Sequence, residues 1–460
     1  MRSAYDVAVI GAGVVGSAIA RELAAYDLTV ALIEARDDVG DGTSKANTAI
    51  LHTGFDATPG TLESVLVARG YHLLKLYAEK TGIPVEVTGA LLVAWTPEEM
   101  AALPALAAKA ERNGYLGCDL VTSEEVYRRV PSLGTGALAG LTVPDEAIIC
   151  TWTTTLALAT DAVARGVDLR LNCTVTGVTP TRDGTALTTS SGEIQAQWVV
   201  NAAGLGADHL DRRFGHDRFE VTPRRGELLV FDKLARPLVP CIVLPVPTSR
   251  GKGVLVSPTI YGNVMVGPTA EDLSDRADTS TSEDGLAFLI DQGRRLLPAL
   301  MGEEITTTYA GLRAATQHPD YLIEIDPDQR YLLVGGIRST GLSASMAIAE
   351  HARDLLHGAG LTNTRRGDLP PPPRLPNLGE AGTRPYQDAD AIEADADYGR
   401  VVCFCERVTR GEVRDAYASP IPPTSLEGLR RRTRVLNGRC QGFFCGAEVT
   451  ALVQRSGGVR

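Results

Sequence analysis

The hydrophobic positions of the first 365 residues or so follow two patterns that alternate along the chain. Short apolar runs, such as residues 6–10 and 29–33, are rich in β-branched side chains, which is typical of strands buried in a parallel sheet. Between them lie amphipathic stretches, such as residues 17–23, that favour helices. The alternation predicts an α/β domain.

The pattern changes at four consecutive prolines, residues 370–373. Proline cannot continue a helix or an inner strand, and a run of prolines favours an extended polyproline II backbone. An acidic stretch, residues 388–397, follows the prolines. We therefore expect a semi-rigid linker over residues 366–399, between the α/β domain of residues 1–365 and a small C-terminal domain of residues 400–460.

The first strand leads directly into a glycine-rich turn of the kind that binds dinucleotides. Gly11 permits the tight turn, Gly13 lets the backbone approach a pyrophosphate, and Gly16 lets the next helix pack close to the strand. A second strand ends at Glu34, where a carboxylate would bind ribose hydroxyls. These features occur in the order that a dinucleotide site requires.

Two later segments favour FAD over NAD as the dinucleotide. Residues 198–204 predict an apolar strand that closes on small residues, which would let the backbone return to the cofactor. Residues 331–336 predict a last strand, followed by a glycine-rich turn and a helix from about residue 343 to 356. The positive N-terminus of that helix would stabilise the charge of a reduced flavin ring.

Charge and hydropathy narrow the class of partner. The chain has 460 residues and a formal net charge of −11, which argues against nucleic acid or an anionic membrane surface as a partner. It has no run of about 18 apolar residues, so we expect no transmembrane segment. The first residues lack the pattern of a signal peptide, which favours a cytoplasmic protein.

Four cysteines lie close to the C-terminus. Cys403, Cys405, Cys440 and Cys445 follow the spacing C-x-C, 34 residues, C-x4-C. Four thiolates suit a [2Fe-2S] cluster, and a one-residue spacer is poor for zinc, although zinc, a disulfide and free thiols remain alternatives. The basic run of residues 430–434 has three interpretations: it offsets the charge of a cluster, docks a partner, or is a solvated helix face.

Residues 5 to about 358 resemble the FAD-dependent family that includes D-amino-acid oxidase, glycerol-3-phosphate dehydrogenase and L-2-hydroxyglutarate dehydrogenase. Residues 43–54 and 59–62 are most similar to the last of these. The resemblance implies a Rossmann-type FAD-binding domain (about residues 1–85, 145–220 and 310–360) with an inserted antiparallel-sheet substrate domain (about 86–144 and 221–309). It also implies cofactor contacts from Gly11, Gly13, Gly16, Glu34, Ala35, Arg36, Thr43, Ser44, Asn47, Val175, Ala203, Gly204, Gly336, Gly341 and Leu342.

The tail, from about residue 400 to 448, resembles the [2Fe-2S] domain of bacterioferritin-associated ferredoxin. It is more similar still to the version fused to anaerobic-type glycerol-3-phosphate dehydrogenases, through the run Gly-Arg-Cys-Gln-Gly at residues 438–442. The last cysteine spacing agrees with the fused form and departs from the free-standing ferredoxin. The resemblance implies that the four cysteines are cluster ligands in a small helical domain.

The family resemblance also indicates residues for the chemistry. His52 and Glu227 are candidate bases for an alcohol proton, and in some relatives a histidine near His52 is joined covalently to the flavin. Arg313 lies in a segment similar to the one whose arginine meets the substrate acid group. Arg225 and Arg338 are further candidate cations for an anionic substrate.

Together these features predict a FAD-dependent dehydrogenase that oxidises a small anionic alcohol by hydride transfer to FAD. A cluster implies a one-electron exit to an acceptor protein or a quinone-linked chain, with any membrane association through a partner subunit. Glycerol 3-phosphate and an L-2-hydroxy acid are both candidate substrates. The alternatives are oxidation of a secondary amine or amino acid, and an electron-transfer subunit of a larger complex.

Overall fold

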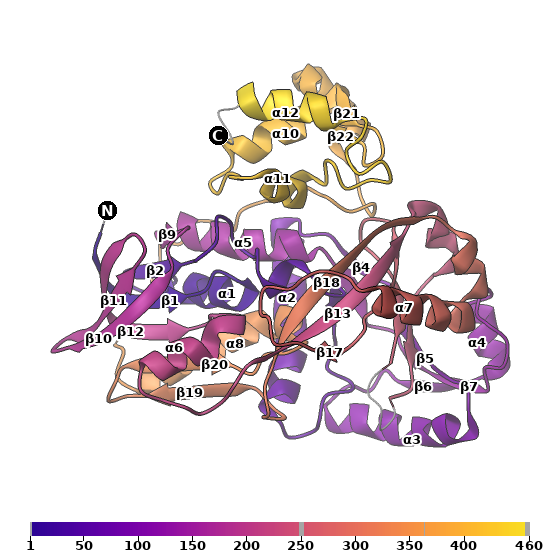
Figure 1. The fold of residues 1–460 in the computed structure, drawn as a ribbon, viewed down its shortest axis with the longest axis horizontal. Coiled ribbons are helices and arrows are strands. Elements are labelled where there is room, and N and C mark those ends of the chain that lie inside the picture. The colour runs from indigo at the N-terminus through magenta and orange to yellow at the C-terminus, as the bar shows by residue number, and fades with distance from the viewer. Residues whose placement is uncertain (1, 248–252, 363, 456–460) are drawn as a thin grey trace.

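The structure, a computed structural model, describes residues 2–247, 253–362 and 364–455. Figure 1 shows a body built from two large sheets with their helices, and a small C-terminal domain lying against one side of it. Among the described residues, no helix is long and apolar enough to span a membrane.

The first sheet has eight strands and is parallel at its centre. β1 (Ala4–Ile10) lies between β2 (Val30–Ile33) and β12 (Gly192–Asn201), and β20 (Tyr331–Gly335) pairs parallel with β12. All residues of β2 and β20 are buried, as their continuous apolar runs predict. The sheet is completed by β9 (Asp168–Arg170), β10 (Val175–Thr181), β11 (Gly184–Thr189) and β19 (Leu322–Asp326).

The helices that position the cofactor site pack against one another beside this sheet. α1 (Val14–Leu23) follows β1 and contacts α5 (Thr151–Ala164) and α8 (Gly341–Gly358), and α8 contacts α2 (Leu62–Thr81). Because α1 follows β1 and α8 follows β20, both helices begin at the carboxyl ends of parallel strands. In open α/β sheets this edge is where cofactors bind.

The second sheet has nine strands and is antiparallel except for β5 (Ala90–Ala94) and β14 (Ile242–Pro245), which pair parallel. Its two long strands, β13 (Thr222–Phe231) and β18 (Ile305–Ala315), pair antiparallel along their lengths. The remaining elements of this region are α3 (Pro97–Arg112), β6 (Asp119–Thr122), α4 (Ser123–Arg129), β7 (Ala139–Val143), β15 (Leu255–Pro258), β16 (Val264–Gly267), β17 (Glu271–Asp272) and α7 (Glu283–Leu296).

A third, three-stranded sheet joins the two regions, and short elements connect the rest. Its strands are β3 (Ile50–Leu51), β4 (Val85–Val87) and β8 (Ala147–Ile149), and the connecting elements include η1 (Thr43–Lys45), α6 (Ala207–Arg213), η3 (Lys233–Leu238) and η4 (Pro298–Gly302). The expected α/β fold, with an inserted antiparallel sheet and a small helical tail, is confirmed.

The proline-rich and acidic stretch is held against the rest of the protein. The backbone N–H of Leu375 donates to the carbonyl of Thr81 at 2.7 Å, and that of Glu380 donates to Ile260 at 3.0 Å. The acidic part forms α9 (Ala389–Ala394), after which Asp395 pairs with Arg414 of the tail at 2.6 Å. Residues 366–399 therefore follow the surface of the body instead of spanning open solvent.

The tail forms its own small core. A hairpin of β21 (Val401–Cys403) and β22 (Val408–Thr409) precedes α10 (Arg410–Ala418), α11 (Leu426–Thr433) and α12 (Gly446–Arg455). Val402, Leu429 and Val449 are almost fully buried between these elements. The cysteines lie in the hairpin and in the loop between α11 and α12.

Candidate cofactor, substrate and cluster sites

The glycine-rich turn after β1 has the tight geometry that a dinucleotide site needs. Gly11 has φ +105°, and a Cβ on it would lie 2.4 Å from the carbonyl oxygen of Ala202. A Cβ on Gly16 would lie 1.8 Å from the carbonyl oxygen of Gly11. The end of β12, which leads into Ala203 and Gly204, therefore lies against the turn, as the sequence pattern of small residues predicts.

Glu34 is fixed beside this turn. Its Oε2 accepts the backbone N–H of Ala12 at 2.8 Å, and its Oε1 accepts that of Arg36 at 2.9 Å. Burial raises the pKa of the Glu34 carboxyl, although these two N–H groups act in the opposite direction. Each carboxylate oxygen has a second lone pair, so the residue fits the binding of ribose hydroxyls.

The segment of residues 43–47 runs along the N-terminus of α1. The Oγ of Ser44 accepts the backbone N–H of Val14 at 2.9 Å, and Asn47 donates to the Ser44 carbonyl at 3.0 Å. A Cβ on Gly42 or Gly204 would meet nothing within 4 Å, so the surface beside the turn is open. A pyrophosphate placed at the first turn of α1 would contact this segment.

The other expected cofactor contacts are distributed around the same edge. Val175 begins β10, two residues after Cys173, whose N–H bonds the Glu34 carbonyl at 2.8 Å. Gly336 has φ +68° in the turn after β20, and Gly341 and Leu342 begin α8. The structure thus brings residues from six separated segments to one edge of the sheet.

His52 is paired with a buried acid that the sequence analysis missed. Its Nδ1 lies 2.8 Å from the Oε2 of Glu146, which has no exposed side-chain surface. The Oε1 of Glu146 accepts from the backbone N–H and the hydroxyl of Thr53 at 2.7 and 2.9 Å. The N–H of His52 donates to Ser343 Oγ at 2.8 Å, so the pair lies at the N-terminal turn of α8.

Only a weak sequence signal marks Glu146. It is an acid directly before an apolar run, and nothing near it in the chain indicates a histidine partner 94 residues away. The pairing depends on the three-stranded sheet, in which β3 lies beside β8 and brings the two residues together.

Arg313 lies on the side of β18 that faces the segment of residues 43–47. Tyr309, on the same face of the strand, donates its hydroxyl to the Asn47 carbonyl at 2.8 Å, and a Cβ on Gly311 would lie 2.1 Å from the Ala46 carbonyl oxygen. Burial, followed by the charge of nearby Arg224, lowers the pKa of the Arg313 guanidinium. No carboxylate among the described residues pairs with it.

The structure contradicts the expectation that Glu227 and Arg225 act with Arg313. Arg224 pairs in register with Arg313, so its neighbours along β13 point to the opposite face of the sheet. There Glu227 accepts from the hydroxyls of Ser282 and Thr269 at 2.9 and 3.0 Å, next to the first turn of α7. Arg225 forms ion pairs with two carboxylates, those of Glu271 at 2.6 Å and Asp278 at 3.4 Å. Both residues are structural in this fold.

Arg338 lies in the turn between β20 and α8, where its guanidinium donates to the backbone carbonyl of Pro319. No carboxylate among the described residues pairs with it. Its role as a substrate contact stays a prediction.

The four tail cysteines lie together as two thiol pairs. The side chain of Cys405 lies next to that of Cys440, and the side chain of Cys403 lies next to that of Cys445. Burial raises the pKa of Cys445 to about 12. Within the described residues, no group of three or more ligand side chains is arranged around one metal ion. Two thiol pairs fit a cluster of two irons better than a single zinc ion.

The backbone of the α11–α12 loop is shaped around these sulfurs. A Cβ on Gly438 would lie 2.1 Å from the Cβ of Cys405, so only glycine permits the approach of the two ligand segments. Although burial opposes the change, backbone N–H groups of Phe444, Gly442 and Phe443 lower the pKa of Cys440. Such N–H donors stabilise thiolate sulfur, the form that binds iron.

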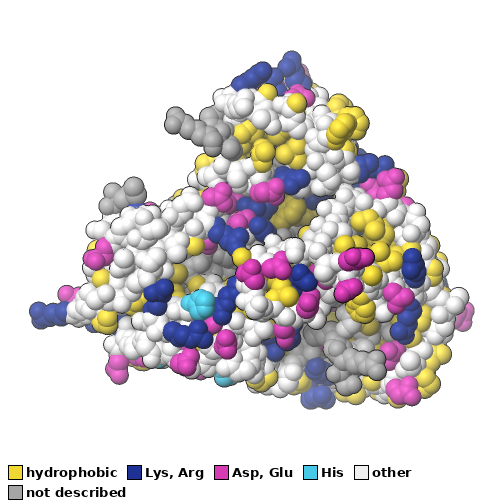
Figure 2. All heavy atoms as spheres, in the orientation of Figure 1, with side chains coloured by type: hydrophobic (Ala, Val, Ile, Leu, Met, Phe, Trp, Pro, Cys, Tyr) yellow, Lys and Arg dark blue, Asp and Glu magenta, His cyan; other side chains and the backbone are white. Residues whose placement is uncertain are grey.

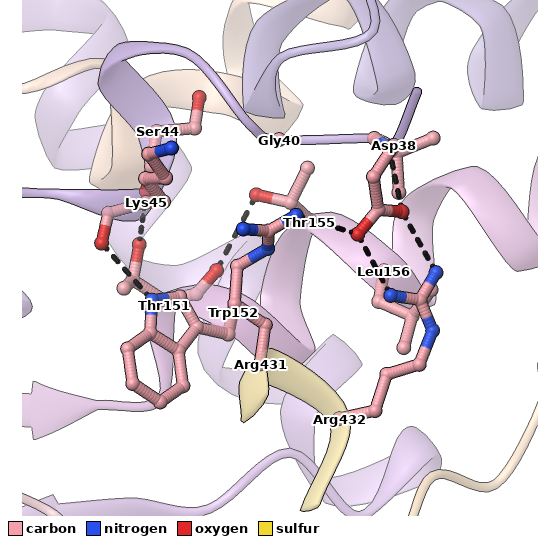
Figure 3. Close-up of a pocket in the computed structure, with 11 residues that line it drawn as sticks. Asp38, Gly40, Ser44, Lys45, Thr151, Trp152, Thr155, Leu156, Arg431 and Arg432 are labelled. Carbon is pink, nitrogen blue, oxygen red and sulfur yellow. Dashed lines mark hydrogen bonds and ion pairs between the residues drawn. The ribbon is translucent and has the colours of Figure 1, made fainter. Parts of the chain in front are cut away.

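The basic run of α11 is buried against the body, so the interpretation as a solvated helix face is wrong. Arg432 donates two hydrogen bonds to Asp38 at 2.8 Å, and Arg431 pairs with Asp38 at 2.7 Å (Figure 3). Arg431 also pairs with Asp41 at 2.8 Å. Both arginines and Asp38 are buried. Asp38 and Asp41 lie between Glu34 and Ser44, so the tail is docked on the loop that carries several of the expected cofactor contacts.

Fold and sites together define a flavin-dependent oxidoreductase that carries an iron–sulfur domain. Residues 6–355 match the FAD dependent oxidoreductase family, and the chain belongs to that family. Residues 401–455 match the BFD-like [2Fe-2S] binding domain. The cofactors are FAD and a [2Fe-2S] cluster.

Three known proteins illustrate the relationship. The chain is 35% identical to glycerol 3-phosphate dehydrogenase of Caloramator mitchellensis, over 99% of this chain and 95% of that protein. It is 30% identical to L-2-hydroxyglutarate dehydrogenase of Escherichia coli, over 58% of this chain and 64% of that protein. The FAD-bound L-α-glycerophosphate oxidase of Mycoplasma pneumoniae superposes with a TM-score of 0.77 and 30% identity, covering 82% of this chain and all of that one.

Proposed function

We propose that the protein is a glycerol-3-phosphate dehydrogenase that passes electrons from FAD to its own [2Fe-2S] cluster. The observation that carries the proposal is Arg313, a cation without a carboxylate partner among the described residues, on the strand face beside the segment of residues 43–47. A half-buried guanidinium in such a place favours an anionic ligand, and its planar fork matches a phosphate group.

His52 is the proposed base for the substrate hydroxyl. Its Nδ1 faces Glu146, so Nε2 is the ring nitrogen that takes the proton. Glu146 fixes the ring orientation and stabilises the imidazolium that forms when the proton arrives. FAD, when bound, accepts the hydride from the alcohol carbon. Arg313 holds the phosphate end and thereby orients the hydroxyl toward His52.

Two arguments favour glycerol 3-phosphate over an L-2-hydroxy acid. The similarity to the glycerol 3-phosphate dehydrogenase extends over nearly the whole chain and includes the tail, whereas the hydroxyglutarate relative matches little more than half of it. The solved oxidase, whose name also specifies glycerophosphate, covers 82% of this chain. Likeness to amine and amino-acid oxidases rests on structures under 25% identical, which show the fold alone.

The electron acceptor is proposed to be a separate redox protein that reaches the cluster directly. Three phenylalanines next to the cysteines are strongly exposed: Phe404 by 76%, Phe443 by 86% and Phe444 by 78%. Hydrophobic side chains are gathered on the visible face of the tail domain in Figure 2. Exposed apolar groups of this kind are typical of protein–protein contacts. An acceptor in a quinone-linked chain would be reached in the same way, through a partner subunit.

An anaerobic substrate screen tests the proposal. Glycerol 3-phosphate should bleach the flavin absorption of the purified holoprotein within a single turnover, and L-2-hydroxyglutarate, L-proline and glycine should not. A protein reduced by an amino acid but not by glycerol 3-phosphate would have the amine-oxidising function.

Release of all flavin on acid precipitation is expected, because His52 is proposed as a base and not as a covalent flavin ligand.

A further inference from the structure

A continuous chain of buried contacts joins the cofactor side of the body to the cluster ligands. The indole N–H of Trp152, the second residue of α5, donates to the carbonyl of Lys45 at 3.0 Å (Figure 3). The indole stacks on Tyr261, with ring centres 5.2 Å apart and an interplanar angle of 26°. The guanidinium carbon of Arg434 lies 4.0 Å from the centre of the Tyr261 ring and 5.8 Å from that of Trp152.

The chain continues from Arg434 into the cysteine hairpin. Its Nε donates to the Oε2 of Glu406 at 2.8 Å, and both side chains are almost fully buried. Glu406 is covalently adjacent to Cys405, one of the four expected ligands. The ion pair holds the pKa of Glu406 below its ordinary value against the effect of burial. A charged pair in this environment keeps a fixed geometry, because breaking it would leave an uncompensated buried charge.

The flavin end of the chain follows from the geometry of the body. The segment of residues 43–47 lies at the N-terminus of α1, where the pyrophosphate binds, and His52 lies at the N-terminus of α8. A dinucleotide that extends from the first helix toward the second runs beside Ser44 and Lys45. Trp152 contacts the same segment, since its indole bonds Lys45 and the neighbouring Thr151 bonds the Ser44 carbonyl at 2.8 Å.

We propose that Trp152, Arg434 and Glu406 form the path along which electrons pass from the flavin to the cluster. The inference rests on the proposed electron flow from FAD to the tail. Reoxidation of the flavin takes two transfers, and in each of them one electron leaves the reduced flavin and one ferric iron becomes ferrous. The cluster passes the first electron to the acceptor protein before it takes the second, and the single proton that the hydride brought to the flavin passes to water. Trp152, Arg434 and Glu406 neither gain nor lose an electron and form no bond. Their closely packed atoms fill the space between the flavin of the body and the cluster of the tail, through which the electron passes.

The test starts from the flavin and does not use the substrate. A light pulse with a photoreductant reduces FAD in the anaerobic holoprotein, and the cluster absorption and its electron paramagnetic resonance signal report the arrival of the electron. Trp152→Leu should slow this transfer by about tenfold or more, equivalent to about 1.4 kcal/mol of barrier. The midpoint potentials of FAD and the cluster and the resonance line shape should be the same as in the unaltered protein. A general structural disturbance would change them.

Three controls make the result decisive. Trp95→Leu makes the same chemical change in the substrate region and should leave the transfer rate unchanged. Arg434→Lys keeps the charge next to Glu406 but removes the planar group over the two rings, and should also slow the transfer. Arg430→Lys changes an arginine of the same basic run that pairs with Glu427 within α11 at 2.7 Å, and should not. Equal rates in Trp152→Leu and the unaltered protein, or equal slowing by Arg430→Lys and Arg434→Lys, would overturn the path. Failure of glycerol 3-phosphate as a substrate would leave this measurement intact.

Discussion

His52 and Glu146 form a histidine–carboxylate pair, with 2.8 Å between Nδ1 and Oε2, and Glu146 is completely buried. The second carboxylate oxygen is held by Thr53, so the acid cannot turn away from the ring. The pair resembles the orienting half of a catalytic triad in its geometry, because one ring nitrogen is held by a buried carboxylate. Glu146 is therefore a positioning residue for the proposed base.

Glu146→Gln should lower the rate of flavin reduction by roughly 10- to 100-fold at saturating glycerol 3-phosphate. The imidazolium loses its partner anion in this variant, so the acid limb of the pH profile of kcat/KM should move to lower pH. Glu146→Asp should restore part of the rate, because it returns the charge. A uniform loss of rate at every pH, with no rescue by aspartate, would show that Glu146 only supports the fold.

Arg313→Ala should lower kcat/KM for glycerol 3-phosphate by about 30- to 1,000-fold, corresponding to about 2 to 4 kcal/mol, mainly through KM. The flavin spectrum should be unchanged, because Arg313 is expected to bind the substrate and not the cofactor. Arg224→Ala is the matched control, since Arg224 is the cross-strand partner of Arg313 but pairs with Asp272 at 2.6 Å. Equal kinetics in the two variants would remove Arg313 from the substrate site.

Gly438→Ala should prevent assembly of the cluster while FAD stays bound. A methyl group there would lie 2.1 Å from the Cβ of Cys405 and would force the two ligand segments apart. Gly446→Ala, one residue after Cys445, is the matched control, because a Cβ there meets nothing within 4 Å. Iron and acid-labile sulfide per flavin are measured in both. A full iron content in Gly438→Ala would contradict the proposed ligand geometry.

Asp38→Asn should weaken the docking of the tail by about 3 to 5 kcal/mol, because Arg432 would be left buried without an anion and Arg431 would keep only Asp41. Protease accessibility of the tail and small-angle scattering report the loss. Asp37→Asn is the matched control, since Asp37 receives only a threonine hydroxyl from the tail. A tail that is docked as firmly in Asp38→Asn as in the unaltered protein would show that other contacts hold it.

The contact of Asp38 with Arg431 and Arg432 also makes the docking of the tail depend on pH. Burial alone would raise the pKa of Asp38, but Arg432 and Arg431 outweigh it and hold that pKa below 3.8. A carboxyl whose pKa is depressed in the docked state stabilises that state fully above about pH 4, and the stabilisation is lost as pH falls through the depressed value. Tail docking should therefore weaken below about pH 4 in the unaltered protein, and Asp38→Asn should remove this acid-dependent contribution.

Much of the cofactor site could be predicted from the sequence because its signals are local. Gly11 has a positive φ in the turn, Gly16 is required by its contact with Gly11 in the same strand–turn–helix unit, and Glu34 directly follows the next strand. The cysteine spacing is likewise confined to two short segments of the tail. In such cases neighbouring residues determine the geometry, and the order of residue types in the chain is sufficient evidence.

Other features were decided only by the tertiary structure. Glu227 and Arg225 looked suited to the substrate site, but the register of β13 with β18 directs them to the face away from Arg313. A strand alternates its side chains, so a change of one position reverses their direction, and composition alone does not fix the register. The basic run of α11 likewise carried no sign that a carboxylate of the body would bury it.

The chain therefore specifies its two cofactors by itself, because each is bound by motifs whose parts are close in the sequence. The base partner Glu146, the direction of Arg313 and the bridge from Trp152 to Glu406 depend on segments that meet only after the sheets have paired and the tail has docked. Contacts between such distant segments are determined by the packing of the whole molecule, and packing depends on all the buried side chains together.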